Sequence, residues 1–335
     1  MKTKQKFESK LVFGIIIILL IFITANYFVE KNQQDFVALG YEYFYVGDIE
    51  NALLVFKQHI ELNPKDDIIL AEIGISYYEI DNFIDAKTYF LKSLKINNKN
   101  TVALVGLSKL YLVEDDLENY NNVVDFLLSI KPNDSWIYLE LGITLFRKDM
   151  YPEAHQMFLL AYKYDSNNDV ILKELGWNYY ELRNFSKALE SFNKSIKINP
   201  NNDLALAGIG TVYSRLNNSK DAIGYFKRAL KINPNNKLSY YKLGRIYYDL
   251  NQDDKAMNLI NKSIELSVDY LNDQKTRKSL ESSYQVMGLI ALRQGNTNSS
   301  IDYFEKSLEL DTNVLDEDYI LLTKEEVRLI LLKLK

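Results

Sequence analysis

The chain alternates apolar blocks of helical length with short polar turns. Residues 170–181 and 185–198 are two such blocks, and the polar pair Arg183-Asn184 separates them. The stretch 199–202 (Asn-Pro-Asn-Asn) follows the second block, and its proline lacks the N–H that a continuing helix needs. These positions predict two antiparallel helices joined by a tight turn and followed by a second turn.

The same pattern returns every 34 residues. One small residue, usually glycine, marks each period. Alanine follows six of these seven positions by twelve residues, phenylalanine follows five by sixteen and proline follows four by twenty-four, as Ala188, Phe192 and Pro200 follow Gly176. Self-similarity at a fixed period predicts a repeat architecture, because one helix pair cannot bury its apolar face alone and neighbouring pairs must stack. Ser108 holds the register between the glycines of the grid, which are Gly40, Gly74, Gly142, Gly176, Gly210 and Gly244.

Small residues on this grid predict close contact between the two helices of a repeat. We expect the helices to cross where Gly176 meets Ala188, since a larger side chain would push the axes beyond the roughly 8–10 Å of close packing. We expect the large side chain of Phe192 to fill the gap to the neighbouring repeat.

Leu or Ile comes before the glycine, tyrosine comes three residues after it, and alanine, phenylalanine and proline follow. This pattern resembles the tetratricopeptide repeat. The resemblance covers roughly residues 33–312 and implies an all-α, right-handed superhelical solenoid of about eight helix-turn-helix repeats. The third repeat is the weakest match, with Ser108 for glycine and Tyr120 for alanine. The predicted repeats lie near 33–66, 67–100, 101–134, 135–168, 169–202, 203–236, 237–270 and 281–314.

The period is interrupted before the eighth repeat. Gly288 comes 44 residues after Gly244, ten more than the period requires. The extra residues lie around 269–280, and we expect them to lengthen the second helix of the seventh repeat or to form a polar loop.

Residues 315–335 are predicted to cap the array. Thr323 and Glu326 fit a capping box that opens a helix over residues 324–334. Terminal repeats need such a cap, so we expect the helix to be buried against the eighth repeat. A contact with a partner, or self-association through this helix, is the alternative.

The N-terminal region predicts a membrane anchor. Residues 11–29 carry no charge, and a helix of this length spans ~28 Å, close to the ~30 Å of a bilayer's hydrocarbon core. The positive-inside rule makes residues 1–10 a basic cytoplasmic tail and places the repeats outside the cytoplasm, at the plasma or inner membrane in a bacterium. The basic residues compared are Lys2, Lys4, Lys6 and Lys10 before the segment and Lys31 after it.

Two other arrangements remain open for this region. Ile23-Thr24-Ala25 is a poor version of a signal-peptide cleavage pattern, and cleavage would produce a secreted soluble adaptor. A cytosol-facing membrane receptor or co-chaperone is the other alternative. The chain resembles mitochondrial import receptors in this respect, because they also join an N-terminal anchor to such repeats.

Composition offers little chemistry for an enzyme. The chain has no cysteine, and His59 and His155 lie on helices three repeats apart, so they cannot form one site. Neither a phosphate-binding glycine loop nor a His-Glu-x-x-His helix is present, and we expect no catalytic, cofactor or metal site. A net charge of −5 without a basic stripe argues against nucleic-acid binding.

The family resemblance implies a concave groove lined by the first helix of each repeat. It places groove-facing side chains at the third position before the grid glycine and at the first, fourth and fifth after it. Aromatic and cationic residues at these positions suit an extended peptide, although aromatic residues on first helices also serve simple packing. The predicted partner-binding residues are Phe146, Arg147, Lys173, Trp177, Tyr180, Tyr241, Arg245 and Tyr248.

One sub-class of the family binds the C-terminal carboxylates of chaperones through a clamp of basic and amide residues. Lys173 and Arg245 stand at two positions of that clamp, but Trp177 and Tyr241 stand where Asn and Lys belong. Chaperone tails are therefore not expected. The sequence as a whole predicts a membrane-anchored, non-enzymatic scaffold for peptides or proteins, as an assembly or quality-control factor would be.

Overall fold

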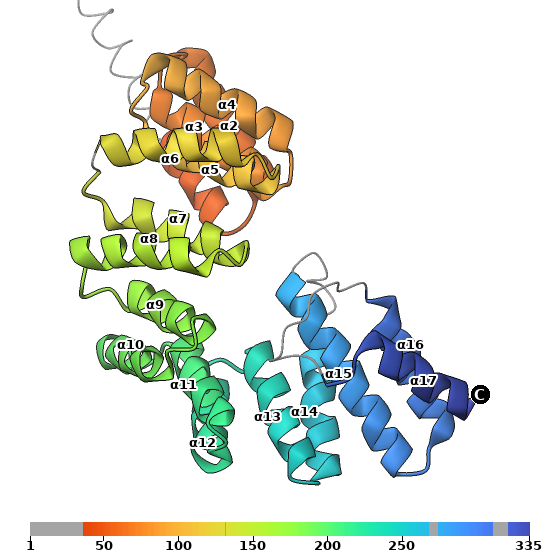
Figure 1. Cartoon of the computed structure of the whole chain (residues 1–335). Helices are drawn as coiled ribbons and strands as arrows, with labels where there is room; N and C mark the ends of the chain where they lie inside the picture. The colour runs from red at the N-terminus through yellow and green to blue at the C-terminus, as the bar shows by residue number, and fades with distance from the viewer. Residues whose placement is uncertain (1–35, 131, 268–273, 311–320) are drawn as a thin grey trace, which may run out of the picture. The chain divides into compact units, whose positions relative to one another are not determined.

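The computed structural model describes residues 36–130, 132–267, 274–310 and 321–335. Regular secondary structure in these ranges is α-helical, in helices joined by short turns (Figure 1). The chain divides into two compact units, Met1–Asp149 and Met150–Lys335. None of the helices in the described ranges is long and apolar enough to cross a membrane, and the predicted span 11–29 lies outside those ranges.

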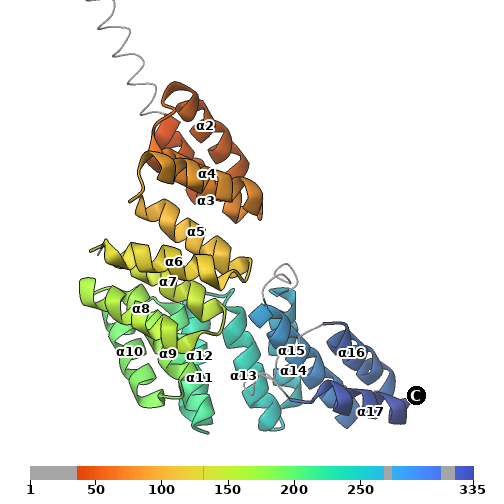
Figure 2. The same cartoon turned by 45° about the horizontal axis from the view of Figure 1, so that its top comes forward.

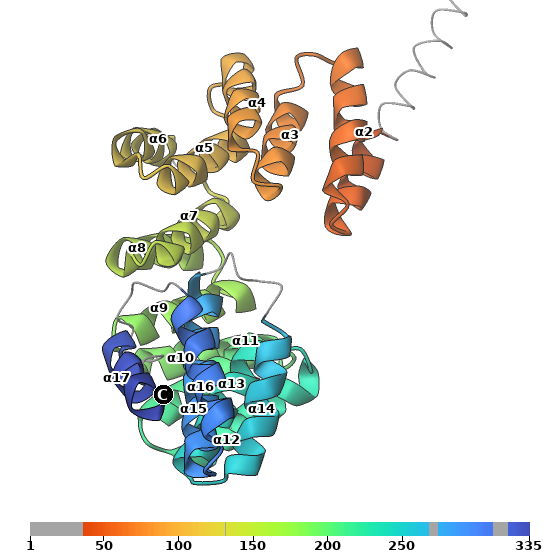
Figure 3. The same ribbon diagram turned by 90° about the vertical axis from the view of Figure 1, so that its right-hand side faces the viewer.

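The first unit contains helical residues 36–45 and the helices α2 to α7. α3 packs against α4 and α5 against α6, while α3 also packs on α5 and α5 on α7. First helices of successive repeats therefore lie side by side, and Figure 3 shows α3, α4 and α5 in succession. The helices are α2 (Ile49–Leu62), α3 (Asp67–Glu79), α4 (Phe83–Ile96), α5 (Thr101–Val113), α6 (Leu117–Ser129) and α7 (Ser135–Arg147).

The second unit continues the same arrangement. α9, α11, α13 and α15 pack in sequence, and each also packs on the second helix of its own repeat (Figure 2). Together the described residues of the two units form an all-α array of about eight helix pairs. The helices are α8 (Tyr151–Tyr164), α9 (Asp169–Glu181), α10 (Phe185–Ile198), α11 (Asp203–Arg215), α12 (Ser219–Ile232), α13 (Lys237–Asp249), α14 (Asp253–Glu265), α15 (Gln274–Arg293), α16 (Thr297–Glu309) and α17 (Lys324–Leu334).

A buried aromatic ring sets the distance between the helices of a repeat. Phe192 on α10 is fully buried, and a Cβ placed on Gly176 of α9 would lie 2.5 Å from its Cδ1 atom. The same ring also contacts Gly208 on α11, the first helix of the next repeat. The ring therefore fills the gap to the neighbouring repeat, as expected from the sequence.

Asparagine side chains link the start of one repeat to the start of the next. Asn202 caps α11 by accepting from Ala205 N, and its Nδ2 donates to Asp169 Oδ2 over 2.9 Å. Asn199 donates to the same carboxylate oxygen over 2.9 Å. Asp203 receives the equivalent pair of hydrogen bonds in the next repeat. The polar turn thus stabilises two helix starts at once.

The interruption before the eighth repeat lies at a different helix from the one expected. α14, the second helix of the seventh repeat, ends at Glu265, whereas α15 has 20 residues and begins at Gln274. The described part of the insertion therefore lengthens the first helix of the eighth repeat. An added turn at a helix start keeps the downstream grid intact, because Gly288 still contacts Phe304 on α16.

The C-terminal helix is the predicted cap. Thr323 and Glu326 form both hydrogen bonds of a capping box at the start of α17. Val327 and Leu331 are buried in one cluster with Phe304 of α16. α17 therefore packs on α16, the second helix of the eighth repeat; residues 315–320 of the predicted cap lie outside the described ranges.

Replacing Gly176 by Ala should lower the free energy of unfolding by about 1–3 kcal/mol, because the new methyl group overlaps a fully buried ring. Urea denaturation followed by circular dichroism measures the change. Gly224→Ala is the matched control: Gly224 is an exposed residue inside α12, and a Cβ added to it would have no other atom within 4 Å. There, alanine should raise stability by up to about 1 kcal/mol. Equal effects at the two sites would contradict the role given to the ring.

Candidate functional site

The first unit holds a pocket on the face of its first helices. Its volume is about 430 Å³, and its walls come from helical residues 36–45, α3, α5 and α7, with Phe90 of α4. The lining residues are Tyr41, Phe44, Tyr45, Glu72, Ile75, Tyr78, Glu79, Phe90, Val102, Val105, Gly106, Lys109, Trp136 and Glu140.

A glycine of the third repeat lines the pocket. Gly106 stands 34 residues after Glu72 and 34 before Glu140, so the flanking repeats carry glutamate at its grid position. A Cβ at Gly106 would overlap the ring of Phe90, which is fully buried. The close approach of that ring therefore requires glycine, and Gly106 and Phe90 line the pocket together with the two glutamates.

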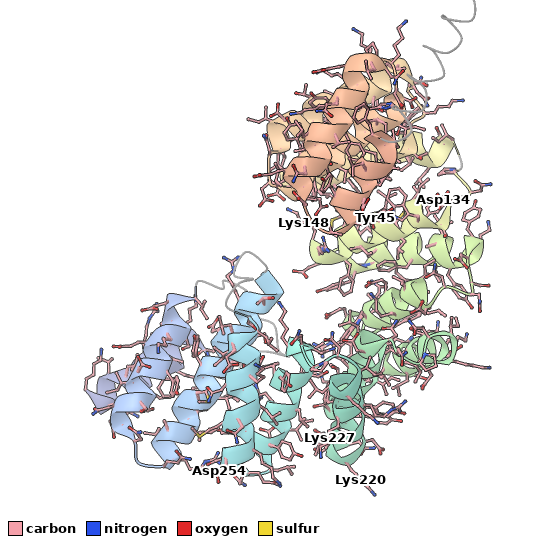
Figure 4. The ribbon with its side chains drawn as sticks, turned by 180° about the vertical axis from the view of Figure 1, so that it is seen from behind. Tyr45, Asp134, Lys148, Lys220, Lys227 and Asp254 are labelled. Atoms are coloured by element: carbon pink, nitrogen blue, oxygen red, sulfur yellow. The ribbon has the colours of Figure 1, made fainter. Side chains whose placement is uncertain are left out.

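Aromatic side chains form much of the pocket wall. Trp136 in the first turn of α7 is 38% exposed, and Tyr45 is 81% exposed at the end of helical residues 36–45 (Figure 4). Tyr41 stacks on Tyr45 with ring centroids 6.3 Å apart. Large apolar surface that faces solvent in a concave site can contact a ligand at low cost in side-chain entropy.

A cation is held between a carboxylate and an aromatic ring in the same pocket. Lys109 Nζ lies 3.0 Å from Glu140 Oε2 and 5.2 Å from the ring centre of Tyr78. Burial raises the pKa of Tyr78, and the positive charge of Arg147 acts in the opposite direction. Arg147 is exposed at the end of α7 and is one of the predicted partner-binding residues. Its charge acts on the pKa of Tyr78, which lines this pocket.

Glu72 is the pocket's most perturbed acid. Its Oε1 accepts a hydrogen bond of 3.0 Å from the Tyr41 hydroxyl. Burial raises the pKa of Glu72, and this hydrogen bond lowers it by a smaller amount. Burial also raises the pKa of Tyr41, with the Glu72 charge adding to the shift. The charged form of the Glu72 carboxylate therefore carries a cost in solvation free energy.

The other predicted partner-binding residues sit in varied surroundings. Phe146 is half-buried on α7. On α9, Lys173 Nζ pairs with Glu174 over 2.8 Å, and Trp177 packs edge-on against Phe192 at 5.3 Å. On α13, the half-buried Tyr248 ring lies under the Arg293 guanidinium at 4.8 Å. Whether these side chains bind a partner stays a prediction.

Two of the predicted residues are inside the protein. Tyr180 is 4% exposed and packs in the cluster of Ala188 and Phe192. Tyr241 is 0% exposed, and its hydroxyl donates to Ser282 of α15 over 2.8 Å. The half-buried Arg245 also donates to this serine, over 3.3 Å. The grid rule placed both tyrosine rings in a groove, whereas neighbouring helices cover them, so neither ring is open to a partner.

The paired helices and the pocket on their first helices define the chain as an all-α helical-repeat protein. Family models named "Tetratricopeptide repeat" match residues 36–66, 170–202, 204–236, 225–258 and 281–314. The chain is therefore a tetratricopeptide repeat protein. No curated protein matches it in sequence.

Solved structures share the fold at low sequence identity. The crystal structure of the APC/C hetero-tetramer Cut9-Hcn1 matches with a TM-score of 0.61 and 16% identity over 85% of this chain, which spans only 52% of that chain. The human IFIT1 dimer with PPP-AAAA matches with a TM-score of 0.55 and 17% identity, covering 79% of this chain and 69% of that one. A tetratricopeptide repeat protein from Parabacteroides merdae gives a TM-score of 0.49 at 18% identity, covering 91% and 98%.

Glu72→Gln should raise the melting temperature at pH 7, because the amide keeps an acceptor for Tyr41 and removes a buried charge. A carboxyl whose folded pKa is raised destabilises the fold above that pKa and costs nothing once it is protonated in both states. The difference from the wild type should therefore vanish as the pH falls below the ordinary carboxyl pKa of about 4.3. The other titratable groups of the pocket are common to both proteins and are Tyr41, Tyr45, Tyr78, Glu79, Lys109 and Glu140.

Thermal unfolding followed by circular dichroism between pH 4 and pH 8 measures this difference. Glu79→Gln, at an exposed position of the same pocket, is the control and should leave the melting temperature nearly unchanged. A melting temperature for Glu72→Gln at or below that of the wild type at pH 7 would show that the carboxylate is not strained.

Proposed function

We propose that this chain is a non-enzymatic scaffold that binds an extended peptide segment of a partner protein in the pocket of its first unit. The observation that carries the proposal is a 430 Å³ pocket to which four successive first helices contribute aromatic and charged side chains. A segment laid across these helices would contact side chains spaced by the 34-residue repeat. Aromatic anchors beside placed polar groups are typical of sites where a few contacts supply most of the binding energy.

The membrane anchor is part of the same proposal. The uncharged segment 11–29 and the lysines before it support insertion with the N-terminus in the cytoplasm. The repeats would then hold partners near the outer face of the membrane, in an assembly or quality-control role. The paired-helix array supports a scaffold role, because such arrays present long binding surfaces.

The two tryptophans of the chain separate this pocket from the groove predicted on α9. Trp136→Ala in the full chain, kept in detergent, should weaken binding of peptides selected from a random phage-displayed library by at least about tenfold. Trp177→Ala is the matched control, since Trp177 packs on Phe192 outside the pocket, and it should change binding by less than about twofold. Fluorescence anisotropy measures both affinities, and circular dichroism checks that each variant is folded. The reverse order of effects would move the site to α9.

Cysteine labelling tests the proposed topology, because the chain has no cysteine of its own. Lys220→Cys places a thiol on an exposed position of α12 (Figure 4), and a membrane-impermeant maleimide should label it on intact cells. Ala222→Cys on the same helix is fully buried and should stay unlabelled until the protein is denatured. Protection of the Lys220→Cys thiol on intact cells, with labelling after lysis, would overturn the exported orientation.

A further inference from the structure

The pocket of the first unit carries an excess of negative charge. Glu72, Glu79 and Glu140 line it, and Lys109 is the basic residue among its lining side chains. Lys109 is already paired with Glu140. The charge left over therefore belongs to Glu72 and Glu79, of which Glu79 is exposed to solvent and Glu72 is half-buried. A ligand with a negative group, such as a carboxylate or a phosphate, would be repelled from this pocket.

Lys109 shows how the pocket stabilises a cation. Its ammonium group lies against the Tyr78 ring and beside the Glu140 carboxylate. Both interactions favour a cation, and both are stronger in a partly desolvated site than at an open surface. The same combination of carboxylate and aromatic ring recurs on the other side of Gly106, where Glu72 lies next to Tyr41. There, the described part of the chain supplies no Lys or Arg to the carboxylate.

We propose that the pocket binds an Arg or Lys side chain of an extended partner segment, with its cationic group beside Glu72 and its apolar neighbours on Tyr45 and Trp136. This assignment rests on the proposed function and adds the chemistry of the ligand. Glu72 lines the same pocket as Tyr45 and Trp136, so a side chain that enters the pocket can reach its carboxylate. The Tyr41 hydroxyl is a neutral hydrogen-bond donor to the part-buried Glu72 carboxylate. A cationic side chain of the partner would supply the positive charge that pairs with this carboxylate.

The size of the pocket favours a peptide over a free metal ion. A volume of about 430 Å³ exceeds what one cation fills, and aromatic rings make up a large part of the walls beside the three glutamates. No group of three or more His, Cys, Asp or Glu side chains in the described ranges is arranged to hold a metal ion. A basic side chain with apolar neighbours matches both the charge and the walls.

The test begins with the phage-displayed library applied to the full chain. Enriched peptides should contain Arg or Lys flanked by apolar residues. Synthetic versions then carry citrulline in place of Arg, or norleucine in place of Lys, which remove the charge and keep the length. Each replacement should weaken binding to the wild type by at least about tenfold. Glu72→Gln should weaken binding of the charged peptide by a similar factor and leave the uncharged peptide unaffected, so the two changes together cost no more than one alone.

Glu79→Gln is the matched control, because it makes the same change of net charge at an exposed position and should cost less than about threefold. Glu140→Gln provides a second variant should Glu72→Gln fail to fold, and it should also reduce the preference for the charged peptide. Equal effects of Glu72→Gln and Glu79→Gln would reduce the proposal to long-range attraction and overturn it.

The remaining outcomes separate this inference from the function it rests on. Enriched peptides that bind through Trp136 but lack a basic residue would overturn the cation assignment and leave the peptide scaffold standing. Failure to enrich any peptide would count against both. Light scattering tests whether a second copy of the chain occupies the pocket. If the wild type is a dimer and Glu72→Gln dissociates it, the surface mediates self-association instead of binding a partner, and the proposal is overturned.

Discussion

A phenylalanine on several of the second helices lies against glycines of the first helices, and the packing of α3, α4 and α5 in the first unit follows from that contact. Phe90 touches Gly74 in its own repeat and Gly106 in the next, so one ring fixes two helix distances. The contact holds successive first helices side by side. Gly106 also lines the pocket that contains Glu72 and Glu140. Packing and candidate binding site therefore share one residue.

Much of the fold could be predicted from the sequence, because its cause is periodic. The 34-residue grid predicted paired helices, and the capping box at Thr323 predicted α17. Contacts between residues on different helices were harder to predict. The ring of Phe192 lies against both Gly176 and Gly208, and Asn202 bonds Asp169, 33 residues earlier in the chain. The hydrogen bond between Asn202 and Asp169 does have a sequence signal, since one aspartate and two asparagines recur together at a fixed spacing.

The binding pocket was only partly accessible to the same reasoning. The rule that groove positions follow the grid glycine by one, four and five residues does describe Tyr41, Phe44 and Tyr45, but it was applied to later repeats richer in aromatic and basic residues. It omitted the position two residues before the glycine, where Glu72 and Gly106 decide the pocket's charge and depth. It also missed the burial of Tyr241, which depends on Ser282 of the lengthened α15. A sequence pattern does not show which residues of other helices lie next to a given position.

A crystal structure of the chain with an enriched basic peptide tests the account most directly. The account predicts that the peptide lies on helical residues 36–45, α3, α5 and α7, with a guanidinium or ammonium nitrogen about 3 Å from the Glu72 carboxylate. A peptide bound instead on α9 and α13, beside Trp177 and Arg245, would contradict it. So would a peptide in the pocket whose basic side chain points to solvent.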